Sequence, residues 1–255
     1  MDKDEIRDYG MELGADVVGF ADIADYRSER SPDPKTILPG VRSMVVLGYR
    51  EIHGAIESEN KRISMTTRMG MMELGLKNNY LMTRYIERGT ETKAVSVPPS
   101  YPLDMDLPYM GSVGDVSLRH AAVAAGLGVF GRHNIVINPR FGTRIVFTAI
   151  LSELPLSSDP KVEEDLCNDC GLCVEACPAG ALNEEGKTDF MKCLKISQPY
   201  GIGGLIRYHY KMIDATDEMK KEMLRDPKFL NLYQAQFIGF QYFCFKCMEA
   251  CPACI

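Results

Sequence analysis

The cysteines of this chain lie in its last third and have the spacing of iron–sulfur ligands. The sequence contains nine cysteines, and the first four form the run C-x2-C-x2-C-x3-C-P between Cys167 and Pro178. In this bacterial ferredoxin pattern, three thiolates hold one [4Fe–4S] cube and the fourth binds a second cluster. A shorter run, C-x2-C-x3-C-P, begins at Cys244. Together the two runs predict a pair of clusters that carry electrons.

The second run is one cysteine short of a full repeat. The position three residues before Cys244 is Gln241, and the isolated Cys193 is the candidate replacement. Cys254 is left over, and we interpret it as a spare thiol, the alternative being a ligand role in place of Cys193. Crossed ligation then predicts one cluster on Cys167, Cys170, Cys173 and Cys251, and the other on Cys177, Cys193, Cys244 and Cys247.

Disulfides and zinc explain the cysteines less well than iron–sulfur clusters do. Disulfides need an oxidising compartment, whereas the chain begins with the charged segment Met1–Glu5 and no apolar stretch follows it. Structural zinc normally uses two separated cysteine pairs, not three cysteines in so short a run. We therefore expect clusters in a reducing cytoplasm.

Length and composition favour two domains. A chain of 255 residues fits one large domain or two modest ones. Cysteine is absent before Cys167, and the segment Glu153–Pro160 has the proline and serine content of a connector. We therefore place a first domain at residues 1–158 and a second at residues 159–255. No apolar run is long enough to predict a membrane span, and the net charge of −6 disfavours nonspecific binding of nucleic acid.

Expected strands and helices alternate along the first domain. A proline-rich loop that includes Tyr109 precedes the last of these helices. Because strand and helix alternate, we expect a layered α/β (α+β) fold. Strands are expected over residues 16–21, 43–49, 93–97 and 141–151, and helices over residues 6–13 and 115–125, with a long helix through Met69 that ends near Gly89.

A glycine-rich stretch follows the helix expected at residues 115–125. From Ala125 to Ile135 the sequence reads A-G-L-G-V-F-G-R-H-N-I. Glycine lets a backbone approach a ligand closely, and Arg132 and Asn134 could offer it hydrogen-bond donors. The helix comes before the glycines, which is not the order of a dinucleotide-binding G-x-G-x-x-G turn. Taken alone, such a stretch is more often a structural end to a helix.

Three features follow one another along the chain: the segment Gly14–Phe20, the glycine-rich stretch, and the cysteine runs with Cys193 between them. In this joint pattern the chain resembles the superfamily of epoxyqueuosine reductases and reductive dehalogenases. The resemblance implies a cobalamin-binding, nitroreductase-like domain followed by a two-cluster ferredoxin domain, with Cys193 in the vacant ligand position. It also implies a set of residues against the corrin: Gly126, Gly128, Gly131, Arg132, His133 and Asn134.

The chain departs from the epoxyqueuosine reductases at their catalytic positions. The resemblance implies a proton-donating aspartate at the place of Ser112, and Asp115 is the nearest substitute. Arg119 matches the arginine of the family's Glu-Arg pair, whereas Leu118 replaces its glutamate. Tyr109 is a further catalytic candidate. The C-terminal tRNA-binding region of those enzymes is missing, so we expect a short form that does not take tRNA as its substrate.

These observations predict an iron–sulfur oxidoreductase. Two [4Fe–4S] clusters would take low-potential electrons from a ferredoxin-type or flavodoxin-type donor and pass them to cobalamin for reductive chemistry on a small molecule. One alternative is an electron-transfer or corrinoid-handling protein without a substrate of its own. Another is a flavin-dependent reductase that holds FMN in the same fold. The sequence leaves the substrate and the oligomeric state open.

Overall fold

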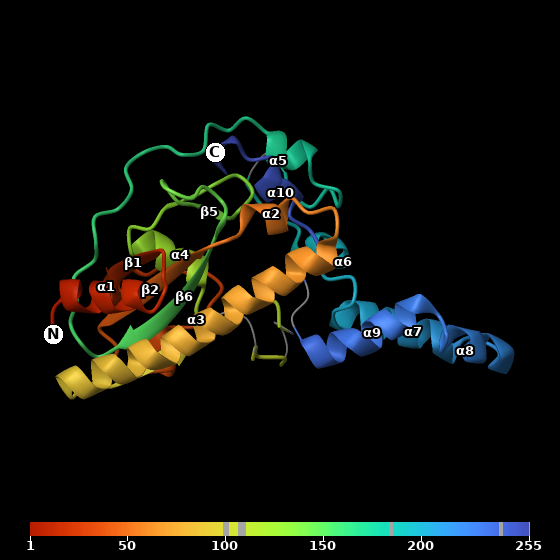
Figure 1. The fold of residues 1–255 in the computed structure, drawn as a ribbon, viewed down its shortest axis with the longest axis horizontal. Coiled ribbons are helices and arrows are strands. Elements are labelled where there is room, and N and C mark those ends of the chain that lie inside the picture. The colour runs from red at the N-terminus through yellow and green to blue at the C-terminus, as the bar shows by residue number, and fades with distance from the viewer. Residues whose placement is uncertain (99–101, 107–110, 184–185, 240–241, 255) are drawn as a thin grey trace.

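The computed structural model combines a layered α/β unit, a cysteine-rich unit and a projecting helical arm (Figure 1). It describes residues 1–98, 102–106, 111–183, 186–239 and 242–254. Every ladder of the main sheet is antiparallel. The sheet has the strand order β1-β2-β6-β3, built from Val17–Asp22, Ser43–Arg50, Ile145–Ser152 and Ala94–Val97.

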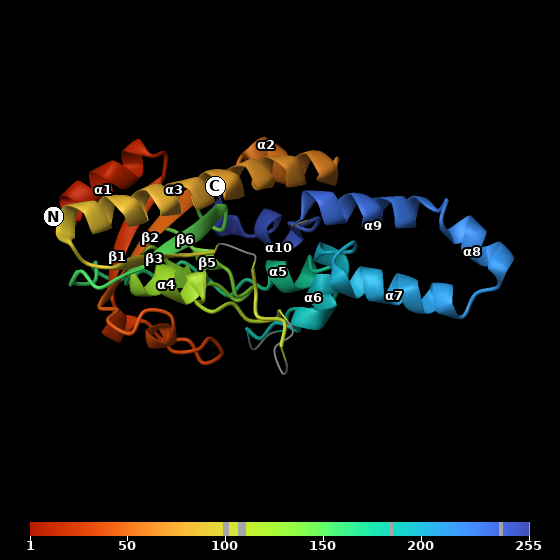
Figure 2. The same ribbon diagram turned by 90° about the horizontal axis from the view of Figure 1, so that it is seen from below.

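Helices cover both faces of this sheet. Side chains alternate along β2, so that Met44 and Val45 point to opposite faces. One face packs on α4 (Leu118–Ala124), and the other packs on α1 (Lys3–Glu12) and α3 (Lys61–Thr90). Figure 2 shows α1 and α3 on one side of the strands and α4 on the other. Burial on both faces accounts for the nearly unbroken apolar run of β2.

Helices α1 and α3 begin at capping residues, and α3 extends to the cysteine-rich unit. Asp2 caps α1 through a reciprocal capping box with Glu5. Asn60 caps α3 by accepting a hydrogen bond from the backbone of its first turn. The N-terminal turns of α3 reach the cysteine-rich unit, where the Lys61 ammonium lies 3.3 Å from a carboxylate oxygen of Glu249.

The cysteine-rich unit is built from segments that lie far apart in the sequence. α5 (Leu172–Glu175) lies within the first cysteine run, and α10 (Lys246–Glu249) packs beside it. Between these two helices along the chain, α6 (Phe190–Ser197) carries Cys193. The chain therefore returns to its own first cysteine run, as crossed ligation of two clusters requires.

Three helices project from the cysteine-rich unit as an arm (Figures 1 and 2). They are α7 (Ile202–Ile213), α8 (Asp217–Met223) and α9 (Pro227–Ile238). Large apolar side chains on α7 and α9 are exposed, including Ile213 and Phe237. Among the described ranges, no helix has both the length and the apolar content of a membrane span.

The structure confirms a mixed α/β fold and moves two of the expected boundaries. The helix expected at residues 115–125 begins only at Leu118, because the residue before it is extended. The strand expected at residues 141–151 begins at Ile145, after a turn. Strand–helix alternation did not specify the direction of pairing, which is antiparallel throughout the main sheet.

The segment expected to act as a connector, residues 153–160, is anchored to the α/β unit. Asp159 accepts a hydrogen bond from the Phe20 N–H at 3.2 Å, and its carboxylate lies 3.1 Å from Arg7 Nη2. The Ser158 hydroxyl accepts a hydrogen bond from the Asp22 N–H. The segment therefore packs along β1 before it reaches the cysteines, and the division of the chain at residues 158 and 159 stays a prediction.

Candidate iron–sulfur centre

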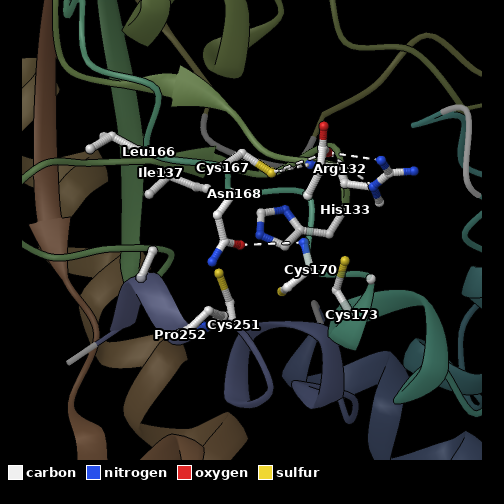
Figure 3. Close-up of a pocket in the computed structure, with 13 residues that line it drawn as sticks. Arg132, His133, Ile137, Leu166, Cys167, Asn168, Cys170, Cys173, Cys251 and Pro252 are labelled. Carbon is white, nitrogen blue, oxygen red and sulfur yellow. Dashed lines mark hydrogen bonds and ion pairs between the residues drawn. The ribbon is translucent and has the colours of Figure 1, made fainter.

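Four cysteines line one pocket, which we call site I. The pocket has a volume of about 200 Å³, whereas a single water needs only roughly 10–15 Å³ on the same measure. It therefore has room for a group of several atoms. Figure 3 shows the thiols around it, with Cys251 approaching from the C-terminal segment. The members of site I are Cys167, Cys170, Cys173 and Cys251.

A tight loop before α5 curls three of these cysteines around the pocket. Asp169 and Gly171 both adopt left-handed backbone conformations, with φ of 53° and 76°. The side-chain oxygen of Asn168 accepts a hydrogen bond from the Cys170 N–H at 3.3 Å. A C-x2-C-x2-C run surrounds a cube by means of such a turn, and glycine adopts it without strain. The fourth predicted ligand, Cys251, comes from the segment after α10.

Arg132 joins the glycine-rich stretch to site I. Its backbone N–H donates a hydrogen bond to Cys167 Sγ at 3.4 Å, and its Nη2 lies 2.9 Å from Asp169 Oδ1. An N–H donor favours the thiolate over the thiol, because it interacts more strongly with the charged form. The ion pair between Arg132 and Asp169 also ties the cysteine loop to the α/β unit.

His133 lies in site I and is almost fully buried, with 5% of its surface exposed. Its Nδ1 accepts a hydrogen bond from the Ile135 N–H at 3.1 Å. Burial lowers the pKa of the His133 imidazole to about 4, which keeps the ring neutral at pH 7. The Nε2 atom is also buried and has no hydrogen-bond partner among the described residues.

The second predicted set of cysteines also comes together, in what we call site II. Cys193 lies within electrostatic range of Cys177 and Cys244, and Cys247 lies within range of all three. None of the four is exposed. Cys193 therefore lies beside the second cysteine run, as the count of ligands predicted. The members of site II are Cys177, Cys193, Cys244 and Cys247.

Burial controls the ionisation of these thiols. Desolvation raises the pKa of Cys173 in site I and of Cys193 in site II, and it raises the pKa of Cys247 to about 12. Such thiols keep their protons at neutral pH unless a cation displaces them. A bound metal centre does so, because it deprotonates the thiols that coordinate it.

The donor set of site I suits a multi-atom cluster. Site I offers four thiols, a donated N–H at Cys167 and a buried ring nitrogen around one pocket. A [4Fe–4S] cube takes one thiolate at each of its four irons, which is the number that the pocket provides. Among the described residues, no group of three or more His, Cys, Asp or Glu side chains is placed to hold a single metal ion.

Aromatic residues and one arginine enclose site II. The guanidinium carbon of Arg68 lies 4.6 Å from the ring centroid of Tyr242 and 5.2 Å from that of Phe245. Its Nη2 lies 2.8 Å from Oε1 of the buried Glu51. Burial raises the pKa of the Tyr242 hydroxyl, Arg68 opposes the rise, and the nearby cysteines of site II add to it. Arg68 on helix α3 thus packs on the aromatic residues that lie beside site II.

The three glycines predicted to face a corrin are explained by the packing of the chain itself. A Cβ atom at Gly126, whose φ is +70°, would collide with the Pro160 carbonyl oxygen. One at Gly128 would collide with the Ile137 carbonyl oxygen, and one at Gly131 would lie 2.9 Å from Ile137 Cδ1. Gly126 also ends α4, as the structural interpretation expects. A corrin contact at these glycines stays a prediction.

Of the other predicted site residues that the structure describes, some lie near α4 and the rest line site I. Arg119 Nη1 donates a hydrogen bond to the Asn134 carbonyl oxygen at 2.5 Å, which joins α4 to the glycine-rich stretch. Asn134 has a left-handed backbone with φ of 60°. Asp115 is half-buried just before α4, and Tyr109 lies outside the described residues. Arg132 and His133 line site I, and the corrin contact that the resemblance implies for them stays a prediction.

A histidine next to Arg119 adds a polar group to the α4 region. His120 Nδ1 lies 2.7 Å from the Ser117 hydroxyl, and its ring centroid lies 4.9 Å from that of Phe130. Burial lowers the pKa of His120, Arg119 lowers it further, and Glu29 opposes both. The imidazole therefore favours its neutral form, which can either donate or accept a proton.

Sequence reasoning missed the groups that support the cysteines from other segments. Asp169 lies inside the first cysteine run, but nothing in the run indicates its pairing with Arg132. Arg68 belongs to no sequence motif. Its position over the Tyr242 ring depends on how α3 crosses the sheet, which local sequence does not determine. The short distance of Tyr242 from Cys244 in the sequence is the one signal that could have singled it out.

Comparisons with known sequences match both parts of the chain. A family model described as a 4Fe-4S binding domain matches residues 160–183. The epoxyqueuosine reductase of Staphylococcus aureus is 28% identical over 218 residues, which cover 75% of this chain and 55% of that protein. The epoxyqueuosine reductase of Bacillus subtilis is 23% identical over 229 residues, which cover 75% and 54%. The chain thus spans about half the length of these curated relatives.

Solved structures share the fold. A crystal structure of epoxyqueuosine reductase with an epoxyqueuosine-modified tRNA stem loop matches with a TM-score of 0.62 at 19% identity, over 98% of this chain and 64% of that one. A catabolic reductive dehalogenase matches with a TM-score of 0.58 at 23% identity, over 75% of this chain and 28% of that one. At these identities the likeness establishes the fold alone.

Proposed function

We propose that this chain, which belongs to the superfamily of epoxyqueuosine reductases and reductive dehalogenases, is an iron–sulfur oxidoreductase. Site I and site II would each hold one [4Fe–4S] cluster and pass single electrons at low potential. The electrons would come from a ferredoxin-type or flavodoxin-type donor and go to a corrinoid held by the α/β unit. When bound, such a group supplies the reductive chemistry, and the protein supplies its surroundings.

One observation carries this proposal: ligands for each cluster come from separate segments of the chain. Cys251 follows α10 and reaches the pocket of the first cysteine run. Cys193 comes from α6 and reaches the neighbourhood of Cys244. Cys193 thus lies near three other cysteines, none of them exposed, and a shared cluster accounts for that approach.

Cobalamin is proposed for the α/β unit on the ground of superfamily membership, with FMN as the alternative. A solved reductive dehalogenase is described as B12-dependent. In this chain, Arg119 and Asn134 are the predicted residues near α4, and the Arg119 guanidinium donates a hydrogen bond to the Asn134 carbonyl oxygen. The glycines are engaged by the chain's own packing, and Arg132 and His133 face site I. The described residues therefore do not define a corrin surface, and we assign no reaction step to one.

Two classes of substrate follow from the superfamily. One is a small molecule that loses oxygen or halide by reduction. The other is a modified base in tRNA, because the curated relatives are epoxyqueuosine reductases and one solved neighbour binds a modified tRNA stem loop. This likeness weakens the expectation against tRNA. A net charge of −6 does not exclude such a substrate, since single-stranded loops are recognised by local stacking and hydrogen bonds.

Anaerobic purification followed by cobalamin binding tests the proposal. We expect about eight irons per chain, as two four-iron clusters require, and stoichiometric binding of added cobalamin, with cob(II)alamin detected by EPR. Reduction of an epoxyqueuosine-containing tRNA, or of a halogenated or epoxide-bearing small molecule, then separates the substrate classes.

Different outcomes remove different parts of the proposal. A protein that loads clusters but leaves the cobalamin spectrum and its own thermal stability unchanged would lose the corrinoid. Stoichiometric FMN in that protein would make it a flavin reductase. A chain that binds cobalamin but turns over neither class of substrate, while it reduces a partner protein, would be an electron carrier.

A further inference from the structure

His133 contributes a buried polar atom to site I that no other described group engages. The ring lines the pocket together with the four cysteines (Figure 3). Its Nε2 is buried and has no hydrogen-bond partner among the described residues. Buried polar atoms nearly always have partners in folded proteins, and the residue that carries this unpartnered atom lines the pocket, so a group bound in the pocket is a candidate partner.

The backbone fixes which nitrogen of the ring carries the proton. The Ile135 N–H donates to Nδ1 at 3.1 Å, so Nδ1 acts as the acceptor. In a neutral imidazole the other nitrogen is then the donor, and Nε2 carries the hydrogen. The low pKa that burial gives to His133 agrees with a neutral ring. Site I therefore contains a neutral N–H donor.

Gly131 holds this donor in place. A Cβ atom at Gly131 would lie 2.5 Å from His133 Cε1 and 3.0 Å from His133 Nε2. Because glycine has no Cβ, the ring can lie flat against the backbone, and it has little space to turn away from the pocket. Gly131, the last glycine of the glycine-rich stretch, thus positions the His133 ring.

We propose that His133 Nε2–H donates a hydrogen bond to a sulfur of the cluster at site I and thereby raises the reduction potential of that cluster. The acceptor is an inorganic sulfide of the cube, since Nε2 has no partner among the described residues, the cysteines included. The inference rests on the proposed function, since it requires the cluster. Reduction places one more negative charge on the cluster, so a hydrogen bond to its sulfur is stronger in the reduced state.

Replacement of His133 by phenylalanine removes the donor and keeps a ring of similar shape. In the EPR-monitored redox titration of the full-length H133F protein, we expect one of the two clusters to become about tenfold harder to reduce, which corresponds to about 59 mV for a one-electron couple. The other cluster keeps its potential. H209F is the matched control, because His209 is exposed on α7 and bonds within its own helix.

Two further measurements separate hydrogen bonding from mere packing. Pulsed EPR of the reduced wild-type protein, labelled with ¹⁵N-histidine, should detect nitrogen coupled to one cluster and an exchangeable proton beside it. Both couplings should vanish in H133F. In G131A the new methyl group displaces the ring, so the same cluster should shift in the same direction while His133 is still present.

The proposal is overturned if wild-type protein with both clusters shows no histidine nitrogen coupling, or if H133F keeps both potentials. Failure of H133F to load its clusters would leave the wild-type coupling as the deciding measurement. A wild-type protein without any four-iron cluster would instead refute the proposed function, so the two failures are distinguishable by iron content alone.

Discussion

Site I and site II offer the same number of thiols in different surroundings. Site I opens to the surface, since Cys170 is exposed, and polar groups from Arg132 and Asp169 border it. Site II has no exposed cysteine, and the rings of Tyr242 and Phe245 lie nearby. One site is thus a polar pocket with hydrogen-bond donors, and the other is an aromatic enclosure.

This difference indicates different potentials for the two clusters. Hydrogen bonds to sulfur and access of solvent both stabilise the more negative, reduced state of a cluster, and burial among apolar groups disfavours it. We therefore expect the cluster at site I to have the higher reduction potential. The sequence predicts four thiol ligands for each cluster, so only the surroundings of the two sites in the fold distinguish them.

The largest expected effect comes from the removal of one ligand from each site. Cys193→Ser should lose about four of about eight irons, since a four-iron cube needs its fourth thiolate, and only the lower-potential EPR signal should disappear. Cys251→Ser should remove only the higher-potential signal. Iron analysis and EPR of both variants check this. If both substitutions abolish the same signal, the crossed ligation is wrong.

Cys254→Ser is the control for these two variants. The side chain of Cys254 lies outside the described part of the chain, and its interpretation as a spare thiol stays a prediction. We expect the variant to keep about eight irons, the full content of two cubes. Loss of iron in Cys254→Ser together with full loading of Cys193→Ser would exchange the roles of the two residues.

Removal of the cation beside site II should destabilise the fold. Arg68→Met leaves the carboxylate of Glu51, which is 4% exposed, without its 2.8 Å partner. We expect the free energy of unfolding to fall by about 3 kcal/mol, because the buried carboxylate loses its ion-pair partner and keeps only the charge of Arg144 nearby. Chemical denaturation under anaerobic conditions measures it. The exposed Arg84 lies on the same helix, and Arg84→Met should change stability little.

A second substitution tests whether the stability lost in Arg68→Met comes from the ion pair with Glu51. Glu51→Gln in the Arg68→Met background neutralises the stranded carboxylate, so it should restore part of the lost stability. No recovery would mean that Arg68 stabilises site II through its contacts with the aromatic rings rather than through Glu51.

The rate of cluster loss should separate the two sites without any substitution. A chelator or oxygen reaches an exposed ligand more readily than an enclosed one, so the cluster at site I should disappear several times faster. The two EPR signals, followed over time after mild exposure, measure both rates in one sample. Equal rates would contradict the view that site II is the more protected.

The smallest expected effect concerns the ion pair at the edge of site I. Asp169 is largely exposed, and its pair with Arg132 should contribute at most about 1 kcal/mol to stability. Asp169→Asn removes a negative charge near the cluster, so the potential of site I should rise slightly while that of site II stays constant. Redox titration at low ionic strength, where screening is weakest, detects the shift.

The sequence predicted the elements and the ligands better than it predicted their surroundings. Short-range signals located β2, α3 and both cysteine sets, because strand patterns, helix caps and ligand spacing act over a few residues. The gap at Gln241 led to Cys193, and the structure places Cys193 beside Cys244. The count of four ligands per cube thus pointed to a cysteine that lies near the second run, and its role as a ligand stays a prediction.

Features that depend on long-range packing could not be predicted. The pairing of β2 with β6 joins Ser43 to Ser152, and no local pattern fixes its antiparallel direction. Gly126 and Gly128 accommodate carbonyl groups of distant segments of the chain, which no local pattern indicates; a corrin contact at this stretch stays a prediction. Position in the sequence likewise gave no reason to place His133 among the cysteines of site I.

The redox titration of the intact, anaerobically purified protein, followed by EPR, tests the central claim most directly. The account predicts two [4Fe–4S] signals with about eight irons per chain and two separate midpoint potentials, the higher belonging to the cluster that Cys251→Ser removes. A single cluster, or two clusters in which Cys251→Ser removes the one of lower potential, would contradict it.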